Sequence, residues 1–292
     1  MTKPPLRRLT VADDLAGCLK LAVNRDWGAE EHKWRFLFTH GEVYGIDAPD
    51  GDGLAGTTIL TRYGSTLAAV SMVLVAARYE GRGFGRHLMT HAIDQAGDAT
   101  VTLHATDRGR PLYEKLGFRP IGTVITHVGR FTPTADHPSG TGTVRPATEA
   151  DLPALLTLDA EVFGADRAPL LRRLPHFAEH TVLAESGSPD GRITGYAAAW
   201  RNIDTLVIGP VIADTPDTAR QLIAALARNA GPDTAVRLDL RTDRLAETDG
   251  LHLWAAAQGV LPGFPNTLMV LGDRDLPGDD RRRHTPLMVA LG

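Results

Sequence analysis

The pattern of apolar and polar positions divides the chain into short segments with two different periods. Runs rich in branched residues, such as SMVLVAA, are typical of buried strands, whereas apolar side chains three or four positions apart are typical of helices. The order of these patterns in the first half predicts a mixed α+β fold. The expected strands are 5–9, 42–46, 54–61, 67–76, 100–104 and 118–130, and the expected helices are 11–23, 29–39, 83–96 and 109–116.

The second half of the chain repeats the first. LRRLTVADDLAGCLKLAV is matched by VRPATEADLPALLTLDAEVFG, which places Asp14 opposite Asp151, and LYEKLGF is matched by LWAAAQGV, which places Gly117 opposite Gly259. ITGYAAAWR, TLVIGPVIA and AVRLDLR are expected to be strands, and PDTARQLIAALARNA the helix that matches 83–96. A repeat this long indicates duplicated domains rather than a solenoid.

The duplication predicts two domains joined by a linker. We expect an N-terminal domain at 1–131 and a C-terminal domain at 143–292. The residues between them, 132–142, are rich in Pro, Gly, Thr and Ser, as linkers are. A length of 292 residues is long for one core and comfortable for two.

Composition and charge narrow the class of protein. A hydrophobic fraction of 43% and a charged fraction of 23% are those of an ordinary globular protein, and the net charge of −4 gives no general attraction to nucleic acid or to anionic membranes. The only cysteine, Cys18, cannot form an internal disulfide, and its apolar helical setting predicts a buried small side chain. With no secretory leader or membrane span in the sequence, we expect a cytoplasmic protein.

The stretch RYEGRGFGRHLM, residues 78–89, has the features of an anion site. Three alternate glycines join a predicted strand to a predicted helix, where several backbone N–H groups have no partner within the helix. Because the glycines leave these N–H groups bare and the helix dipole is positive there, a pyrophosphate is the expected ligand. The alternative is a tight turn that needs positive φ at two or three positions.

Two common nucleotide motifs do not fit this stretch. The P-loop needs Lys followed by Ser or Thr after its last glycine, but Arg86 and His87 stand there. The dinucleotide fingerprint, counted from Gly81, needs a glycine at position 86, and it opens a βαβ unit, whereas this turn follows several antiparallel-looking strands.

The turn YEGRGFGRHLM, the strand VTLHATD and the segment GRPLYEKLGF together resemble the GNAT superfamily of N-acetyltransferases, and the duplication resembles its tandem members. The resemblance implies two tandem domains, each with a mixed, mostly antiparallel sheet flanked by helices. It also implies acetyl-CoA as co-substrate. The residues implied to bind it are Val73, Leu74, Val75, Arg78, Gly81, Arg82, Gly83, Phe84, Gly85 and Arg86. A backbone N–H of 72–74 is implied to face the carbonyl oxygen of the acetyl group.

One residue departs from the family motif, which is Gln or Arg, two residues, Gly, one residue, and Gly or Ala. Aligned here, the motif falls on Glu80, Gly83 and Gly85. A carboxylate repels a pyrophosphate unless it turns away. We therefore expect Glu80 to contribute only its backbone N–H, with Arg78 or Arg82 neutralising its side chain.

The resemblance also implies which residues take part in the transfer reaction. Tyr113 occupies the position of a tyrosine close to the coenzyme sulfur, which makes it the candidate general acid; ordinary packing is the alternative. His104, at the end of its strand, is a candidate general base, or a hydrogen-bonded residue of the cavity wall. Trp27, Glu30 and Glu31 are candidate ligands of the acceptor amine, although a solvated helix face would explain the two glutamates equally.

No metal site is expected. His87 and His91 are spaced i, i+4 on a helix, but no third ligand follows at a plausible spacing. The charged stretch DDRRRH at 279–284 is expected to be a solvated loop, and no nucleic acid partner follows from it.

The second half is expected to have lost the coenzyme chemistry. ADTPDTAR at 213–220 has no glycine and would present Asp214 and Asp217 to a pyrophosphate, and Ala255 stands opposite Tyr113. We expect this half to act as a packing partner that helps to close the acceptor pocket. The alternative is that it binds acetyl-CoA by another route.

The predicted function is an acetyl-CoA-dependent N-acetyltransferase that acts by direct attack on a small amine, such as an amino acid, amino sugar or amine-bearing antibiotic. Two alternatives stay open: an acyl-CoA-binding sensor without turnover, and a protein acetyltransferase. The sequence leaves the oligomeric state open.

Overall fold

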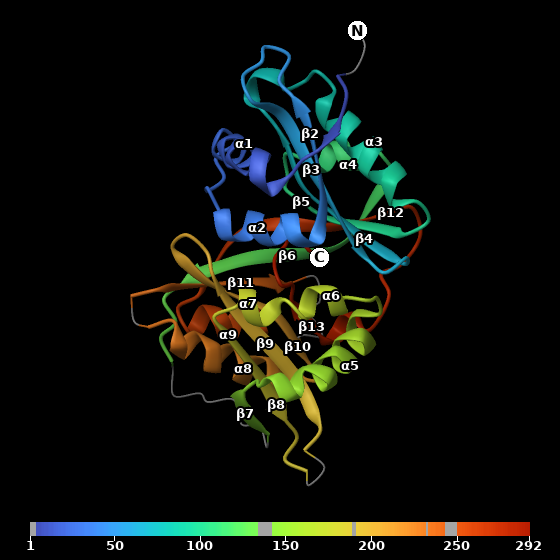
Figure 1. The fold of residues 1–292 in the computed structure, drawn as a ribbon. Helices are drawn as coiled ribbons and strands as arrows, with labels where there is room; N and C mark the ends of the chain where they lie inside the picture. The colour runs from blue at the N-terminus through green and yellow to red at the C-terminus, as the bar shows by residue number, and fades with distance from the viewer. Residues whose placement is uncertain (1–3, 134–141, 189–190, 232, 243–249) are drawn as a thin grey trace. The chain divides into compact units, whose positions relative to one another are not determined.

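The computed structural model describes residues 4–133, 142–188, 191–231, 233–242 and 250–292 (Figure 1). Most of the expected linker, 134–141, lies outside these residues. None of the helices in the described ranges is long and apolar enough to cross a membrane. The elements of the first half are β1 Arg7–Arg8, α1 Val11–Val23, α2 Glu31–His40, β2 Gly41–Asp47, β3 Leu54–Tyr63, β4 Leu67–Val75, the 3₁₀ turn η1 Ala77–Tyr79, α3 Phe84–Ala96, β5 Thr100–Ala105, α4 Arg110–Glu114 and β6 Phe118–Gly129.

Local capping explains where α1 begins. The Thr10 hydroxyl accepts a hydrogen bond from the Asp13 backbone N–H at 3.2 Å, which satisfies one of the free donors at the helix start. Asp14 accepts from the Thr10 N–H at 2.8 Å and from the Arg7 guanidinium at 2.6 Å, so it ties the helix to β1. Apolar residues on one side of α1 are then buried, with Cys18 and Ala22 fully inaccessible.

The strands of the N-terminal half form a sheet in the order β1–β2–β3–β4–β5. All neighbours are antiparallel except β4 and β5, which are parallel. Helices α1 and α2 lie on one side of these strands and α3 on the other (Figure 1). The core under α3 contains Leu60, Val70, Met89 and Leu103, all at most 3% exposed.

The second half follows the order of the first, with two short helices where the first half has α2 and with a 3₁₀ turn and a short strand added near its end. They are β7 Thr143–Pro146, η2 Glu149–Asp151, α5 Leu152–Phe163, α6 Ala168–Leu171, α7 Leu174–Phe177, β8 His180–Glu185, β9 Ile193–Arg201, β10 Thr205–Ala213, α8 Pro216–Asn229, β11 Ala235–Arg241, α9 Leu251–Ala257, β12 Leu261–Leu271, η3 Asp280–Arg282 and β13 Arg283–Thr285. Strands β7, β8, β9 and β10 are antiparallel neighbours, and β10 pairs with β11 in parallel, as β4 does with β5.

The halves exchange strands near their ends. The chain forms two compact units: an N-terminal unit of 1–119, 269–275 and 291, and a C-terminal unit of 120–268, 276–290 and 292. Most of β6 belongs to the C-terminal unit, where it pairs antiparallel with β11. In the N-terminal unit, the end of β12 lies beside β5, and the Thr102 hydroxyl donates to the Met269 carbonyl at 3.0 Å. The domain limits expected from the sequence, 1–131 and 143–292, therefore do not coincide with the compact units.

The predicted fold class is confirmed: both halves form mixed, mostly antiparallel sheets with flanking helices. Helix α1 and strands β9, β10 and β11 have the predicted limits. Two expectations were wrong. Of the strand expected at 5–9, only Arg7 and Arg8 pair with β2. The stretch 279–284, expected to be a solvated loop, forms η3 and the start of β13, which pairs with β10 and buries His284.

Candidate active site

The glycine turn before α3 leaves its backbone uncovered. Gly81 and Gly83 have φ of +74° and +81°, which side-chain-bearing residues rarely adopt, and a Cβ at either position would meet nothing within 4 Å. Gly83 is the N-cap of α3 and offers no side-chain cap to the first amides of a 13-residue helix. The turn thus has both the geometry of a tight turn and the open amides of an anion site.

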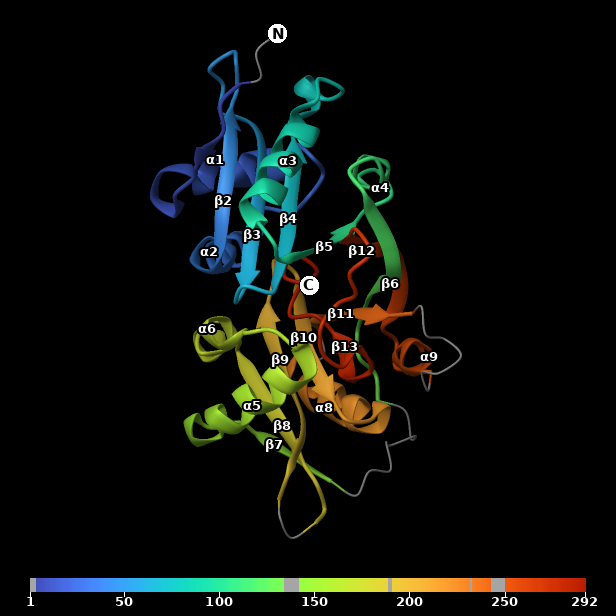
Figure 2. The same ribbon diagram turned by 90° about the vertical axis from the view of Figure 1, so that its right-hand side faces the viewer.

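A cleft opens beside this turn because β4 and β5 separate. Their parallel pairing runs only from Leu67 and Thr100 to Ala69 and Thr102. Farther along β4, Met72 has a φ of +48° within a bulge opposite β3, and its carbonyl accepts from the Thr57 hydroxyl at 3.0 Å. Figure 2 shows the two strands diverging from their paired ends.

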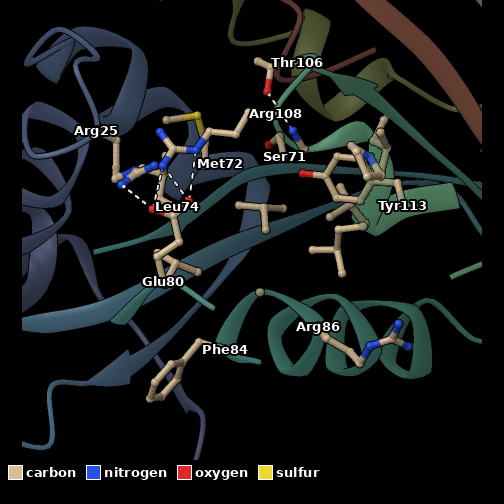
Figure 3. A pocket seen from close by; sticks show the side chains of 18 of the residues that line it. Arg25, Ser71, Met72, Leu74, Glu80, Phe84, Arg86, Thr106, Arg108 and Tyr113 are labelled. Atoms are coloured by element: carbon tan, nitrogen blue, oxygen red, sulfur yellow. Dashed lines mark hydrogen bonds and ion pairs between the residues drawn. The ribbon is translucent and has the colours of Figure 1, made fainter. Parts of the chain in front are cut away.

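A cavity of about 580 Å³ occupies this cleft (Figure 3). Its walls come from the second part of β4, the glycine turn with the start of α3, the end of β5 and helix α4. The predicted site residues that line it are Trp27, Val73, Leu74, Val75, Gly81, Gly83, Phe84, Gly85, Arg86, His104 and Tyr113. Arg25, Ser71, Thr106 and Arg108 also line it and were not predicted from the sequence.

Tyr113 faces the cavity from α4 with its ring packed against protein. The side chain is 8% exposed and lies edge-on to Phe118 at a centroid distance of 6.1 Å. A Cβ on Gly109 would come within 2.9 Å of the ring, so only glycine lets the ring lie so close to that backbone. Among the described residues the hydroxyl has no hydrogen-bond partner. Burial raises the pKa of Tyr113 to about 12, so the phenol stays protonated at neutral pH.

His104 and Ser71 lie on the two strands that border the cleft. His104 is partly buried near the end of β5 and lines the cavity. Ser71, on β4, is 9% exposed, and its hydroxyl has no hydrogen-bond partner within the described part of the chain. A lone serine in an apolar strand carries no sequence signal, which is why Ser71 was missed.

The three arginines around the turn have different roles. Arg78 does not line the cavity: its Nε donates to Asp50 at 3.0 Å and its Nη2 to the Asp52 carbonyl at 2.5 Å. Arg82 lies over the Tyr79 ring at 5.3 Å and does not line the cavity either. Arg86, in the first turn of α3, lines it and forms no ion pair with any described residue.

Glu80 lines the cavity, and its expected roles were wrong: its backbone N–H donates to the Ala77 carbonyl at 3.2 Å, and neither Arg78 nor Arg82 pairs with its carboxylate in the described part of the chain. Arg108 donates two hydrogen bonds of 2.6 Å to its carboxylate, and Arg25 lies 3.7 Å away. These contacts, first the hydrogen bonds from Arg108, lower the pKa of Glu80. Arg78 cannot serve as the partner because its guanidinium is bound to Asp50. No local sequence pattern links Glu80 with a residue 28 positions later and another 55 positions earlier.

The two acidic candidates on α2 do not line this cavity. Glu30, the N-cap of α2, forms an ion pair with Lys33 in which both side chains are largely buried, whereas Glu31 pairs with Arg35 at 2.7 Å on an exposed face of the helix. Of the two tryptophans nearby, Trp34 is fully buried in the core, whereas Trp27 is 37% exposed and lines the cavity.

Both halves of the chain match models of known acetyltransferase families. The model described as "Acetyltransferase (GNAT) family" matches residues 9–118, and the model described as "Acetyltransferase (GNAT) domain" matches 155–283. The chain is 29% identical over 244 residues to the uncharacterized N-acetyltransferase YitH of Bacillus subtilis, covering 82% of this chain and 83% of that one.

Solved structures share the fold. A putative acetyltransferase from Pyrococcus horikoshii superimposes with a TM-score of 0.74 at 16% identity, over 99% of this chain and 95% of the other. A tandem GNAT protein from the clavulanic acid biosynthesis pathway gives a TM-score of 0.64 at 13% identity, over 93% and 99% of the two chains. At these identities the likeness concerns the fold alone.

Proposed function

Because the chain belongs to the GNAT superfamily of N-acetyltransferases, with two of its domains in tandem, we propose that this acetyltransferase uses acetyl-CoA to acetylate the amine of a small molecule within its N-terminal unit. One observation supports this most strongly. A single cavity joins the bare amides before α3 to the hydroxyl of Tyr113. The first feature suits a phosphate, and the second suits chemistry at a thioester sulfur.

The glycine turn fits the pyrophosphate of acetyl-CoA. A side chain at Gly81 or Gly83 would meet nothing within 4 Å, so the backbone there is uncovered, and α3 directs its positive end toward it. Arg86 adds a cation with no competing ion pair among the described residues. The strand residues Val73, Leu74 and Val75 form the wall along which the thioester arm would lie.

Acetyl-CoA supplies a thioester whose carbonyl carbon a neutral amine can attack. In this proposal the Tyr113 phenol donates a hydrogen bond, and then a proton, to the departing sulfur. Its high pKa keeps the proton available, and its buried ring fixes the hydroxyl in place. His104 is our candidate to accept the amine proton, because its ring lies on the β5 wall of the same cavity.

The C-terminal unit is proposed to carry no coenzyme chemistry. Helix α8 is capped by Thr215, whose hydroxyl accepts from the Thr218 N–H at 3.2 Å, so an amide that a phosphate would need already has a partner. Asp217 places a negative charge in the first turn, although Arg220 pairs with it at 2.5 Å. Ala255, opposite Tyr113 in the repeat, has no proton to give.

The test is thiol release. Purified full-length protein is mixed with acetyl-CoA and a panel of amino acids, amino sugars and aminoglycosides, and free CoA is followed with a thiol reagent. The proposal expects amine-dependent release for at least one member of the panel. Binding of CoA without release would favour the sensor hypothesis, and release only with lysine-containing peptides would favour a protein acetyltransferase.

A further inference from the structure

Glu80 stands where the family motif has Gln or Arg, so a negative carboxylate replaces a neutral amide or a cation at that position. Its carboxylate instead contacts two guanidinium groups that come from other segments (Figure 3). Arg25 follows α1, and Arg108 lies in the loop between β5 and α4. All three residues line the cavity next to the glycine turn. The motif position therefore gathers positive charge from elsewhere in the unit.

Arg25 has more donors than partners. Its side chain is only 12% exposed, yet among the described residues its guanidinium makes a single contact, the 3.7 Å ion pair with Glu80. A guanidinium has five N–H donors, and those of Arg25 are not among the fully buried polar atoms without a partner in the described residues, so they are accessible from the cavity. Because this side chain lines the cavity, an anion bound there would satisfy the remaining donors.

Arg108 is also only partly used. Its Nε and Nη2 donate to Glu80, whereas its Nη1 has no partner in the described ranges. The side chain is 65% exposed, so an ion pair at this depth is weak and exchanges easily. The fully charged side chains that line the cavity are four cations and one carboxylate: Arg25, Arg86, Arg108, Lys115 and Glu80. The cavity thus keeps a positive excess even with Glu80 ionised.

We propose that Arg25 and Arg108, held by Glu80, form a guanidinium clamp for phosphoryl oxygens of the co-substrate. In this role Glu80 is a positioning residue: it keeps both guanidinium groups near the turn until a phosphate replaces it, and it leaves donors on each of them free. Arginine matches a phosphate with charge-assisted, often bidentate hydrogen bonds, and these outcompete a solvent-exposed carboxylate contact. The clamp rests on the proposed use of acetyl-CoA. It adds the side chains through which tight binding of the co-substrate would depend on its phosphates.

The test is a binding experiment that needs no acceptor amine. Full-length wild type, Arg25→Gln and Arg108→Gln are titrated calorimetrically with CoA, and pantetheine, which keeps the thiol arm but has no phosphate, is measured by ligand-observed NMR. Arg110→Gln is the matched control, because Arg110 is an arginine of the neighbouring helix that pairs with Glu114 and does not line the cavity. Thermal unfolding of each variant verifies that it is folded. Arg108 is exposed enough for its variant to fold even if the Arg25 variant does not.

Each clamp variant is expected to weaken CoA binding roughly ten- to a hundredfold, the loss typical of a charge-assisted hydrogen bond, with pantetheine and the Arg110→Gln control unchanged. Unchanged CoA affinity in folded clamp variants would overturn the proposal, and the guanidinium groups would then serve a carboxylate of the acceptor or only hold their loops. Equal losses for CoA and pantetheine would also overturn it, since the effect would not concern phosphate. If wild type bound no CoA, the proposed function itself would fail, which is a different result from either.

Discussion

Replacing Tyr113 with phenylalanine separates its chemistry from its packing. The ring is 8% exposed and packs against Phe118 and the Gly109 backbone, and the variant keeps these contacts. The hydroxyl has no partner in the described part of the chain, so its removal leaves no donor or acceptor unsatisfied there. We expect the free energy of unfolding to change by less than about 1 kcal/mol.

Activity should change far more. A positioned general acid contributes roughly 10²–10⁴ in rate, so Tyr113→Phe is expected to lower kcat by that factor with little change in CoA affinity. At pH 8 a phenol with a pKa of about 12 is ionised in only about one molecule in ten thousand, so its own ionisation should not shape the rate profile near neutrality.

The assay is thiol release with an amine that wild type acetylates, run alongside urea unfolding and a CoA titration. A folded Tyr113→Phe protein with wild-type kcat would refute the general-acid assignment. Loss of CoA binding in parallel with kcat would show instead that the hydroxyl helps to hold the co-substrate.

Three further outcomes follow from the structure. Burial raises the pKa of Tyr113 from 10 to about 12, so the phenol of the unfolded chain loses its proton at lower pH than the phenol of the folded protein. Between pH 9 and pH 11 the free energy of unfolding should therefore fall by about 1.4 kcal/mol more in wild type than in Tyr113→Phe, as measured by urea denaturation. Gly83→Ala places a side chain at a φ of +81° and should cost about 1–2 kcal/mol of stability and weaken CoA binding, whereas Gly51→Ala, at a φ of +78° outside the cavity, should cost the same stability with CoA affinity unchanged. The hydrogen bond from Arg7 lowers the pKa of the Asp14 carboxyl, so the stabilisation from this pair is present at pH 7 and is lost as pH falls below about 4. Asp14→Asn should lower the free energy of unfolding by about 1–3 kcal/mol at pH 7. Denaturant unfolding at pH 3–7 should show a smaller loss of stability on acidification in the variant than in wild type, and an equal loss would contradict this.

Periodicity and cap signals predicted most of the fold. Helix α1 has its predicted limits because Thr10 and Asp14 fix its start and an apolar face is buried along its length. Strands β9 to β11 likewise follow their apolar runs. The exchange of β6 and β12 between the units could not be predicted, because the apolar pattern of a strand specifies that it is buried and not which neighbour it pairs with.

The candidate site was predictable where its geometry depends on backbone conformation. The positive φ values of Gly81 and Gly83 and the open amides follow from glycine itself. Side-chain pairing was less predictable, because it joins residues far apart in the sequence: Arg78 forms an ion pair with Asp50, in a loop 28 residues earlier. The positive φ of Met72, in a run of ordinary strand residues, had no sequence signal at all.

The most direct test of the central claim is a crystal structure of the full chain with CoA bound. The account predicts that the pyrophosphate lies on the amides between Gly81 and Gly85 and that the sulfur end lies near the Tyr113 hydroxyl. Coenzyme bound instead at the start of α8, around Thr215, would contradict it, as would crystals soaked in CoA with no coenzyme in the cavity beside α3.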